Sequence, residues 1–330
     1  MNLCVIGAGA WGTAMATHLS RFDHIVTLVP RKMEQAMEIA TSHENRSYLP
    51  GYSLNQNVQV GCELRPVLME AEVAFLACPS KYLRKVCENI RTELDAAWQL
   101  KLFVALCKGL EEGTNLTPCQ ILSEVLPDYN CGALSGPSFA QDVAAGKPTA
   151  IVFAAGKMDE TALSIPHVLS NHCLRIYTSD DLAGVEMGGC LKNVYAIAAG
   201  ICDGLKLGDS AKAALITRSL AEMVRLGTHL GGKMETFYGL SGFGDLIATC
   251  NGPCSRNRSF GEKIAEGIPP DDLSRMMTVE GYRTTACFFQ LCRDLKLEAP
   301  ILKEIYAVLY EKKAPKEALR SLMTRNLKGE

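Results

Sequence analysis

The chain has 330 residues, and its 34 Lys and Arg side chains nearly balance 36 Asp and Glu, for a formal net charge of −2. This balance argues against an extended surface for polyanions, although a local basic pocket stays compatible with it. The length exceeds that of one ordinary domain, so we expect two domains, each able to bury its own core.

The chain begins with a pattern for binding a dinucleotide. Residues 2–6 are a short apolar run typical of a buried strand, and a helical pattern follows to about Ser20. Between them, Gly7, Gly9 and Gly12 form a Gly-x-Gly-x-x-Gly motif. Such glycines permit a tight turn, backbone approach to a pyrophosphate and close helix packing, while the helix N-terminus binds the phosphates. We therefore predict a dinucleotide site, with a merely structural glycine turn as the alternative.

The second strand is expected at Ile25–Val29, and its end bears on cofactor choice. Arg31 and Lys32 follow it, while the first acidic residue, Glu34, comes late. A carboxylate near this position would bind the ribose hydroxyl of NAD, whereas arginine accommodates the 2′-phosphate of NADP. The sequence thus favours NADP without excluding NAD. The alternative is that both cations are solvated residues that open the next helix, expected at 33–42.

Two further buried strands are expected at Val73–Cys78 and Leu102–Cys107. In a doubly wound sheet, ligands bind at the carboxyl ends of the strands. Pro79-Ser80 and Lys108 are therefore expected at the ligand crevice. Lys108 is the first charged residue after its strand and is placed to reach an anion, although a lysine that caps a strand end is common.

The segment 133–140 (ALSGPSFA) predicts a strand, a turn and a helix start, with Gly136 at a close approach and Ser138 as a helix cap. Two more strands are expected at Thr149–Ala155 and Leu174–Thr178, with a helix near 160–170 between them. Strand-like runs then disappear and helical periodicity continues to the end. We predict an α/β fold with a doubly wound Rossmann-type sheet in a dinucleotide-binding domain over residues 1–180, and an all-α substrate-binding domain over 181–330.

The stretch Leu182–Cys202 predicts a long apolar helix without proline. On its wheel, Lys192 shares a face with glycine and alanine, including Gly188 and Ala196. The small neighbours leave room for a bound molecule beside the ammonium, which favours a general acid/base lysine. The alternative is a buried helix between domains whose lysine extends its charge to water. Two charged side chains within the stretch count against a membrane span.

The helical half carries one polar cluster. Asp245 and Thr249 are four residues apart, on one face of a predicted helix. Arg256 and Arg258 flank Asn257 at a predicted helix start, where guanidinium groups and helix N–H groups suit a phosphate. A solvated basic turn is the alternative for this segment. Near the end of the chain, Val-Glu-Gly-Tyr again places a carboxylate beside glycine.

Fourteen cysteines are scattered through the chain without a Cys-x-x-Cys pair. They favour reduced thiols over a disulfide framework, and no completed zinc site is evident. The chain opens directly into a strand, without a basic leader. We expect a cytoplasmic protein that binds no metal and no nucleic acid.

Eight segments together carry a resemblance to a known family. They run from residue 7 to residue 283 and comprise GAGAWGTA, NRSYLPG, CKGLE, SGPSFA, LKNVYAIAAGI, GFGDLIATC, SRNRSFG and VEGYR. In combination the chain resembles the bacterial-type NAD(P)-dependent glycerol-3-phosphate dehydrogenases. The resemblance implies interconversion of dihydroxyacetone phosphate and sn-glycerol 3-phosphate with NAD(P)H, which supplies glycerol 3-phosphate for glycerophospholipid synthesis. It also implies a homodimer.

The resemblance assigns roles residue by residue. It makes Lys192 the proton acceptor and places substrate on Lys108, Gly136, Ser138, Lys192, Asp245, Ser255, Arg256 and Asn257. Together with Arg31 and Lys32, the cofactor set is Gly7, Gly9, Ala10, Trp11, Gly12, Tyr48, Lys108, Ala140, Arg256 and Glu280.

The chemistry of these residues is consistent with ketone reduction. An ammonium at Lys192 can stabilise the nascent alkoxide and donate its proton. Two alternatives remain at this stage. One is a lysine-dependent dehydrogenase of similar build that acts on a 3-hydroxy acid, and the other is a dinucleotide-sensing module without turnover.

Overall fold

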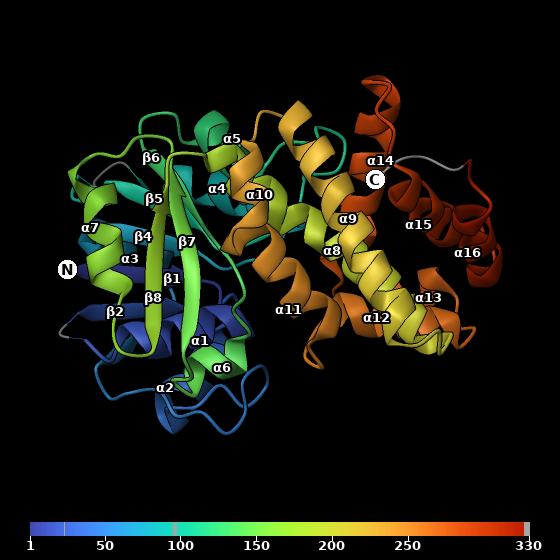
Figure 1. The fold of residues 1–330 in the computed structure, drawn as a ribbon. Coiled ribbons are helices and arrows are strands. Elements are labelled where there is room, and N and C mark those ends of the chain that lie inside the picture. The colour runs from blue at the N-terminus through green and yellow to red at the C-terminus, as the bar shows by residue number, and fades with distance from the viewer. Residues whose placement is uncertain (23, 95–97, 327–330) are drawn as a thin grey trace. The chain divides into compact units, whose positions relative to one another are not determined.

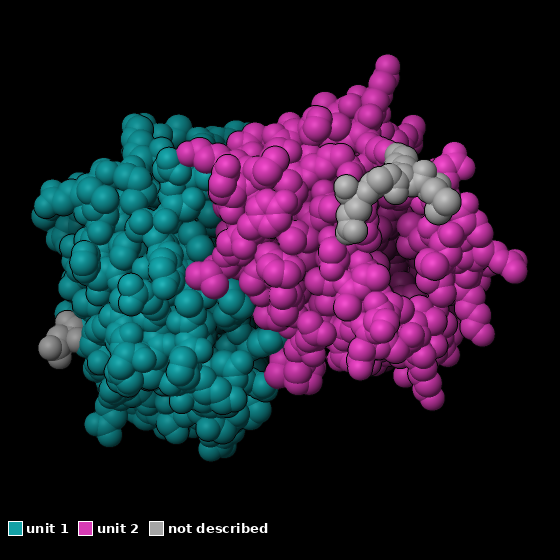
Figure 2. All heavy atoms as spheres, in the orientation of Figure 1, with its two compact units in different colours: residues 1–108, 117–185 teal, residues 109–116, 186–330 magenta. Residues whose placement is uncertain are grey.

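The computed structural model describes residues 1–22, 24–94 and 98–326. The chain divides into two compact units, shown in different colours in Figure 2. Unit 1 comprises residues 1–108 and 117–185, and unit 2 comprises residues 109–116 and 186–330. The segment 109–116 therefore belongs with the helical unit, although it lies in the sequence between two strands of the sheet.

Unit 1 is built on one sheet (Figure 1). In the described part of the chain its strands are β1 (Asn2–Ile6), β2 (Ile25–Val29), β3 (Val58–Val60), β4 (Val73–Leu76), β5 (Leu102–Ala105), β6 (Asn130–Ser135), β7 (Thr149–Ala155) and β8 (Leu174–Ser179). Their order is β3-β2-β1-β4-β5-β6-β7-β8, and all neighbours are parallel except β6 and β7. The chain reverses its direction of strand addition between β1 and β4, where such sheets bind their ligands.

Helices cover both faces of this sheet (Figure 1). They are α1 (Ala10–Leu19), α2 (Met33–Ser42), α3 (Leu64–Glu70), the 3₁₀ turn η1 (Ser80–Tyr82), α4 (Leu83–Arg91), α5 (Pro118–Val125), α6 (Ala140–Ala144) and α7 (Glu160–Leu169). Helix α1 packs against α6 and α7, and α4 packs against α5. The central strands are apolar throughout because both of their faces are buried, as Phe75, Val104 and Phe153 illustrate.

Unit 2 is helical in its described residues. Its elements are α8 (Leu182–Gly204, whose first four residues lie in unit 1), α9 (Asp209–His229), α10 (Met234–Tyr238), the π turn η2 (Leu240–Gly244), α11 (Asp245–Asn251), α12 (Arg256–Ala265), α13 (Pro270–Met276), α14 (Glu280–Asp294), α15 (Pro300–Tyr310) and α16 (Pro315–Met323). The core gathers around α8, with Tyr195, Phe237, Phe260 and Phe288 fully buried.

The small residues of α8 serve helix packing. A side chain at Gly200 would meet the carbonyl oxygen of Arg258 at 1.9 Å, and one at Gly261 would meet that of Ile197 at 2.0 Å. Helices α8 and α12 therefore approach through their backbones. At Gly188 the space is filled by the backbone of Ser241 and Gly242 in η2. The expectation that this glycine leaves room for a ligand is therefore wrong.

The predicted fold class is confirmed, and so are most element positions. The ranges 2–6, 25–29, 33–42 and 149–155 are β1, β2, α2 and β7 as expected. The predicted cap at Ser138 is wrong, because α6 begins after Phe139 without a side-chain cap and the Ser138 hydroxyl donates to the carbonyl of Gly136. Strand β3 and helices α3 to α5 had no clear sequence signal. Among the described residues, no helix combines the length and the apolar character that a membrane crossing needs.

Candidate active site

The glycine turn after β1 has the geometry of a dinucleotide-binding turn. Gly7 adopts a φ of +110°, and a side chain there would meet the carbonyl oxygen of Ala77 at 2.8 Å. A side chain at Gly12 would meet the carbonyl oxygen of Gly7 at 1.9 Å, so α1 packs directly on the turn. At Gly9, in contrast, no atom lies within 4 Å of where a side chain would begin. This open position is where a ligand can approach the backbone.

The start of α1 is suited to an anion. Gly9 is the N-cap and provides no side chain to the first N–H groups, and the first turn contains no acidic residue. Ala10 and Trp11, which open the helix, are partly exposed. Unpaired N–H groups and the helix dipole together favour a phosphate at this point.

Two side chains that sequence reasoning missed hold the glycine turn in place. Asn45 is 1 % exposed, and its amide donates to the carbonyl of Ala8 at 2.9 Å and to the hydroxyl of Thr13 at 2.7 Å. The amide of Gln35 donates to the same carbonyl at 2.8 Å. Asn45 lies in the NRSYLPG segment, of which the sequence analysis assigned only Tyr48, 56 % exposed, to the site, and Gln35 lies outside every segment that it assigned.

Arg31 and Lys32 are exposed where the chain leaves β2 and enters α2, with Lys32 as the N-cap. Within the described residues neither side chain makes an ion pair, so both cations face solvent. The open Gly9, the uncapped start of α1 and these cations together fit a phosphorylated dinucleotide. The fit is carried by backbone geometry and positive charge, not by a buried pocket.

A second set of predicted residues meets beside β5 and β6. The ammonium of Lys108 donates to the carbonyl of Gly136 at 3.0 Å, and the hydroxyl of Ser138 donates to the same oxygen at 3.0 Å. Gly136 has a φ of +134° and lies against Ile151, so the turn requires glycine. Ala140, half-buried, begins α6. Lys108 is therefore held by the turn that carries the other predicted residues.

In unit 2, Lys192 forms a buried ion pair. Its Nζ lies 2.6 Å from Asp245 Oδ1 and 2.8 Å from Thr249 Oγ1. Both partners are more than 50 residues away in the sequence. The side chains of Lys192 and Asp245 are only 10 % and 3 % exposed. Thr249 in turn donates to the backbone carbonyl of Asp245 at 2.6 Å. The lysine therefore does not extend its charge to water, and a buried carboxylate fixes the position of its ammonium.

Beside this pair, a chain of amides links three helices. The Asn257 amide donates to Asn193 Oδ1 at 2.8 Å, and Asn257 Oδ1 accepts from the backbone N–H of Gly281 at 2.9 Å. Asn257 thus ties the start of α12 to α8 and to the start of α14, where Glu280 is half-buried. Ser255 is buried as the N-cap of α12 and accepts from the N–H of Arg258 at 3.2 Å.

The structure separates the two arginines of this segment. Arg258 pairs with Asp203 at 2.6 Å and with Glu262 at 2.9 Å, so its charge is neutralised within the fold. Arg256, at the first position of α12, is exposed and has no ion-pair partner in the described part of the chain. The predicted pair of guanidinium forks is therefore reduced to Arg256.

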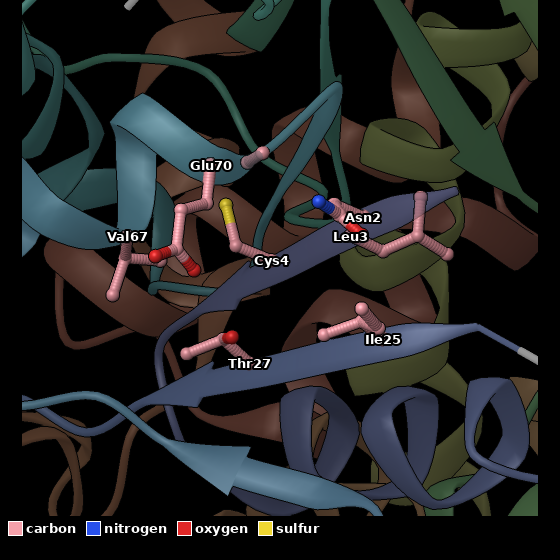
Figure 3. A pocket seen from close by; sticks show the side chains of 8 residues that line it. Asn2, Leu3, Cys4, Ile25, Thr27, Val67 and Glu70 are labelled. Atoms are coloured by element: carbon pink, nitrogen blue, oxygen red, sulfur yellow. The ribbon is translucent and has the colours of Figure 1, made fainter.

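One cavity of unit 1 lies away from these sites. A small pocket lies between α3 and the amino-terminal halves of β1 and β2, lined by Asn2, Cys4, Thr27, Val67 and Glu70 among others (Figure 3). It is at the end of the strands opposite the glycine turn. No group of three or more His, Cys, Asp or Glu residues in the described ranges has the arrangement of a metal site.

Comparison with known proteins identifies the family. The family model described as NAD-dependent glycerol-3-phosphate dehydrogenase N-terminus matches residues 2–161, and the corresponding C-terminus model matches residues 181–320. The chain belongs to the NAD-dependent glycerol-3-phosphate dehydrogenase family. Both the glycine turn and the Lys192 ion pair lie in the segments that the family models match.

Individual relatives agree with the family over the whole chain. Glycerol-3-phosphate dehydrogenase [NAD(P)+] of Nitrosomonas eutropha is 44 % identical over 98 % of both chains. The protein of the same name, numbered 1, from Salinibacter ruber is 42 % identical over 100 % of this chain and 97 % of its own. The crystal structure of glycerol-3-phosphate dehydrogenase from Coxiella burnetii has a TM-score of 0.92 at 34 % identity, and covers 98 % of this chain and 99 % of that one.

Proposed function

We propose that this member of the family interconverts dihydroxyacetone phosphate and sn-glycerol 3-phosphate with NAD(P)H. The observation that carries the chemistry is the buried ion pair of Lys192 and Asp245, 2.6 Å long, with Thr249 as a second partner of the lysine. The cofactor, when bound, supplies or accepts the hydride. The protein must then provide a proton at the oxygen of the substrate and hold the substrate in place.

Lys192 provides the proton. As an ammonium it stabilises the negative charge that develops on the carbonyl oxygen and transfers a proton to it, and as an amine it takes the proton back in the reverse direction. Asp245 holds the ammonium in one place, which keeps the proton donor oriented before the substrate arrives. Thr249, hydrogen-bonded to both residues, fixes the geometry of the pair.

The phosphate of the substrate is proposed to bind at the start of α12. Arg256 offers an exposed guanidinium there, while Ser255 and Asn257 are held in place by their contacts within the fold. A guanidinium beside a helix N-terminus matches a phosphate in charge and hydrogen-bond geometry. Lys108, Gly136 and Ser138 are proposed as further substrate contacts.

The cofactor is proposed to bind through its pyrophosphate at the glycine turn of Gly7, Gly9 and Gly12, beside Ala10 and Trp11. Ala140, Tyr48, Glu280, Lys108 and Arg256 complete the proposed cofactor set. Arg31 and Lys32 are placed to attract the 2′-phosphate, so we expect use of both cofactors with a preference for NADPH.

The test is the oxidation of NADPH, followed by absorbance, with dihydroxyacetone phosphate and with 3-keto acids in parallel. Turnover on dihydroxyacetone phosphate supports the proposal. Turnover on a 3-keto acid alone would assign a hydroxy-acid dehydrogenase instead, and cofactor binding without turnover on either would assign a sensing module. Arg256→Ala should raise KM for dihydroxyacetone phosphate more than for unphosphorylated dihydroxyacetone. Arg275→Ala, an exposed arginine on α13, is the matched control.

Three broader properties belong to the same proposal. The product would supply the glycerol backbone for glycerophospholipid synthesis. A cytoplasmic location is supported by the fourteen cysteines, which are all in the thiol form, as in a reducing compartment. A homodimer is supported by the family resemblance, and the solution mass of the purified protein tests it.

A further inference from the structure

The carbonyl group of Ala8, in the middle of the glycine turn, accepts two side-chain hydrogen bonds. The amide of Asn45 donates to it at 2.9 Å, and the amide of Gln35 donates to it at 2.8 Å. A carbonyl oxygen has two lone pairs, so two donors occupy it fully. Gln35 lies in the first turn of α2, whereas Asn45 follows the end of that helix. Two independent contacts therefore fix the direction of the Ala8 carbonyl.

The direction of this carbonyl sets the direction of the next N–H group. None of the described peptide bonds is cis, and across a trans peptide bond the C=O and the N–H point in opposite directions. Because the Ala8 carbonyl is turned toward the two amides, the N–H of Gly9 points away from them. Gly9 is the partly exposed N-cap of α1, and no atom lies within 4 Å of where its side chain would begin. This N–H therefore belongs to a residue that a ligand can approach.

The openness of Gly9 also makes the turn adjustable. Its φ is −76°, but glycine adopts positive φ values about as readily. A rotation of the peptide between Ala8 and Gly9 would exchange the two groups, and a phosphate would then meet a carbonyl oxygen, which repels an anion, in place of an N–H. The hydrogen bonds from Asn45 and Gln35 oppose this rotation, because it would take their shared acceptor away from both amides.

Asn45 is itself held firmly. Its side chain is buried, and the same amide nitrogen also donates to the hydroxyl of Thr13 on α1 at 2.7 Å. Its backbone carbonyl accepts from the N–H of Leu49 at 2.8 Å and from that of Tyr48 at 3.3 Å. The turn that carries Tyr48, which we assign to the cofactor, is thus closed on the residue that holds the glycine turn.

We propose that Asn45 is a positioning residue for the cofactor. Together with Gln35, it holds the peptide between Ala8 and Gly9 so that the N–H of this peptide faces the pyrophosphate. The proposal rests on the proposed function, in which the pyrophosphate binds at the glycine turn. Neither side chain has to touch the cofactor, because the turn is arranged for an anion before the cofactor arrives and binding requires no rotation of the peptide.

The experiment measures the affinity of the full-length protein for two probes by calorimetric titration. One is NADPH, and the other is adenosine 2′-monophosphate, which has a 2′-phosphate but no pyrophosphate. Asn45→Ala should bind NADPH about tenfold more weakly, which is the contribution of one well-placed hydrogen bond. It should bind adenosine 2′-monophosphate as the wild type does. A general disturbance of the domain would instead weaken the binding of both probes.

The second amide sharpens the test. Gln35→Ala changes a partly exposed side chain and leaves Asn45 on the carbonyl, so it should weaken NADPH binding by only about threefold. In the double variant neither amide holds the peptide. Because either amide alone still opposes the rotation, the loss of affinity in the double variant should exceed the product of the two single losses.

The other end of α1 provides a matched control. The amides of Asn55 and Asn57 donate to one backbone carbonyl, that of the C-cap Ser20, at 3.3 Å and 3.2 Å. Asn57→Ala therefore removes the same kind of hydrogen bond from the same helix, away from the glycine turn. It should keep wild-type affinity for NADPH and for adenosine 2′-monophosphate.

Three results would overturn the proposal: wild-type affinity for NADPH in Asn45→Ala, an equal loss of affinity for the two probes, or single losses that only multiply in the double variant. If Asn45→Ala does not fold, wild-type affinity for NADPH in Gln35→Ala overturns the proposal instead. Binding requires no turnover. A failure of the proposed reaction, seen as missing turnover of the wild type with dihydroxyacetone phosphate, is therefore distinguishable from a failure of this positioning role.

Discussion

The two units build their candidate sites in opposite ways. In unit 1 the glycine turn is made of backbone, and it is open at Gly9, where no atom lies within 4 Å of a side-chain position. In unit 2 the corresponding groups are side chains, and Lys192 and Asp245 are almost completely buried. The first site requires the absence of side chains. The second requires two charged side chains of opposite sign, whose attraction offsets the cost of removing them from water.

This difference determines how each site responds to change. A backbone site is damaged by adding atoms, because a new side chain occupies the place of the ligand or of a neighbouring strand. A buried ion pair is damaged by removing atoms, because the remaining charge stays in a low-dielectric surrounding without its partner. The predictions below use these opposite sensitivities.

The largest effect on stability is expected in unit 2, from Asp245→Ala. This change leaves the buried ammonium of Lys192 without its carboxylate, which should cost about 3–5 kcal/mol of unfolding free energy. The matched control is Asp142→Ala in unit 1, which removes the partner of Lys147 from an ion pair whose side chains are 66 % and 39 % exposed. It should have little effect, because water replaces the lost partner. Urea unfolding of both variants measures the difference, and equal losses would contradict it.

Unit 1 also contains a buried titratable group, His18 of α1, which is fully buried with its Nε2 2.7 Å from the carbonyl oxygen of Leu169. Burial lowers the pKa of this imidazole from 6.5 to about 4. Between these two pH values the unfolded chain binds more protons at this histidine than the folded chain does. The contribution of His18 to stability is therefore fully present above about pH 6.5 and is lost as the pH falls toward 4. The difference between the two pKa values corresponds to about 3 kcal/mol of unfolding free energy.

Unfolding measured across this pH range in the wild type and in His18→Gln checks the prediction. Glutamine keeps a side-chain donor for the Leu169 carbonyl but does not titrate. The variant should therefore lose less stability than the wild type as pH decreases. Parallel curves for the two proteins would show that His18 is not the responsible group.

The glycine turn predicts two different failures from the same kind of substitution. Gly12→Ala forces a methyl group against the carbonyl of Gly7 and the side chain of Ala77, and should cost about 1–3 kcal/mol of stability. Gly9→Ala meets open space and should leave stability nearly unchanged while weakening NADPH binding. Thermal unfolding and NADPH titration of both variants separate the two effects. A Gly12→Ala protein as stable as the wild type, or a Gly9→Ala protein with normal affinity for NADPH, would contradict the prediction.

The smallest effect concerns cofactor preference. Arg31 is exposed, so its attraction for a 2′-phosphate should be worth only about 0–1 kcal/mol and should decrease with ionic strength. Arg31→Asp replaces this attraction with a repulsion and should reverse the preference for NADPH. The ratio of kcat/KM with NADPH to kcat/KM with NADH measures this preference. An unchanged ratio would make Arg31 a solvated residue that opens α2.

The same contrast explains what the sequence could predict. The glycine turn depends on residues that are neighbours in sequence, and its spacing after a strand was sufficient to predict it. Asp245 and Thr249 are one helical turn apart and were placed on one face for the same reason. Lys192 meets them only through tertiary packing, and periodicity alone did not establish that contact.

Other features were beyond prediction because they depend on distant partners. The sequence does not distinguish Arg258 from Arg256, because Asp203, which neutralises the charge of Arg258, is 55 residues away. The space beside Gly188 was filled by η2, which no pattern connects to α8. Asn45 gave no sign of reaching the glycine turn, because its bond to Ala8 spans 37 residues. The segment 109–116 joins unit 2 through contacts such as that of Glu112 with Arg283 on α14.

The most direct test of the central claim, that Lys192 moves the proton, is the turnover number of Lys192→Arg with dihydroxyacetone phosphate and NADPH. Arginine retains a positive charge to pair with Asp245, but it does not release its proton at physiological pH. We expect kcat to decrease by about 10²–10⁴, the usual contribution of a general acid or base, with unchanged affinity for NADPH. A turnover number near that of the wild type would contradict the assignment of Lys192 as the proton donor.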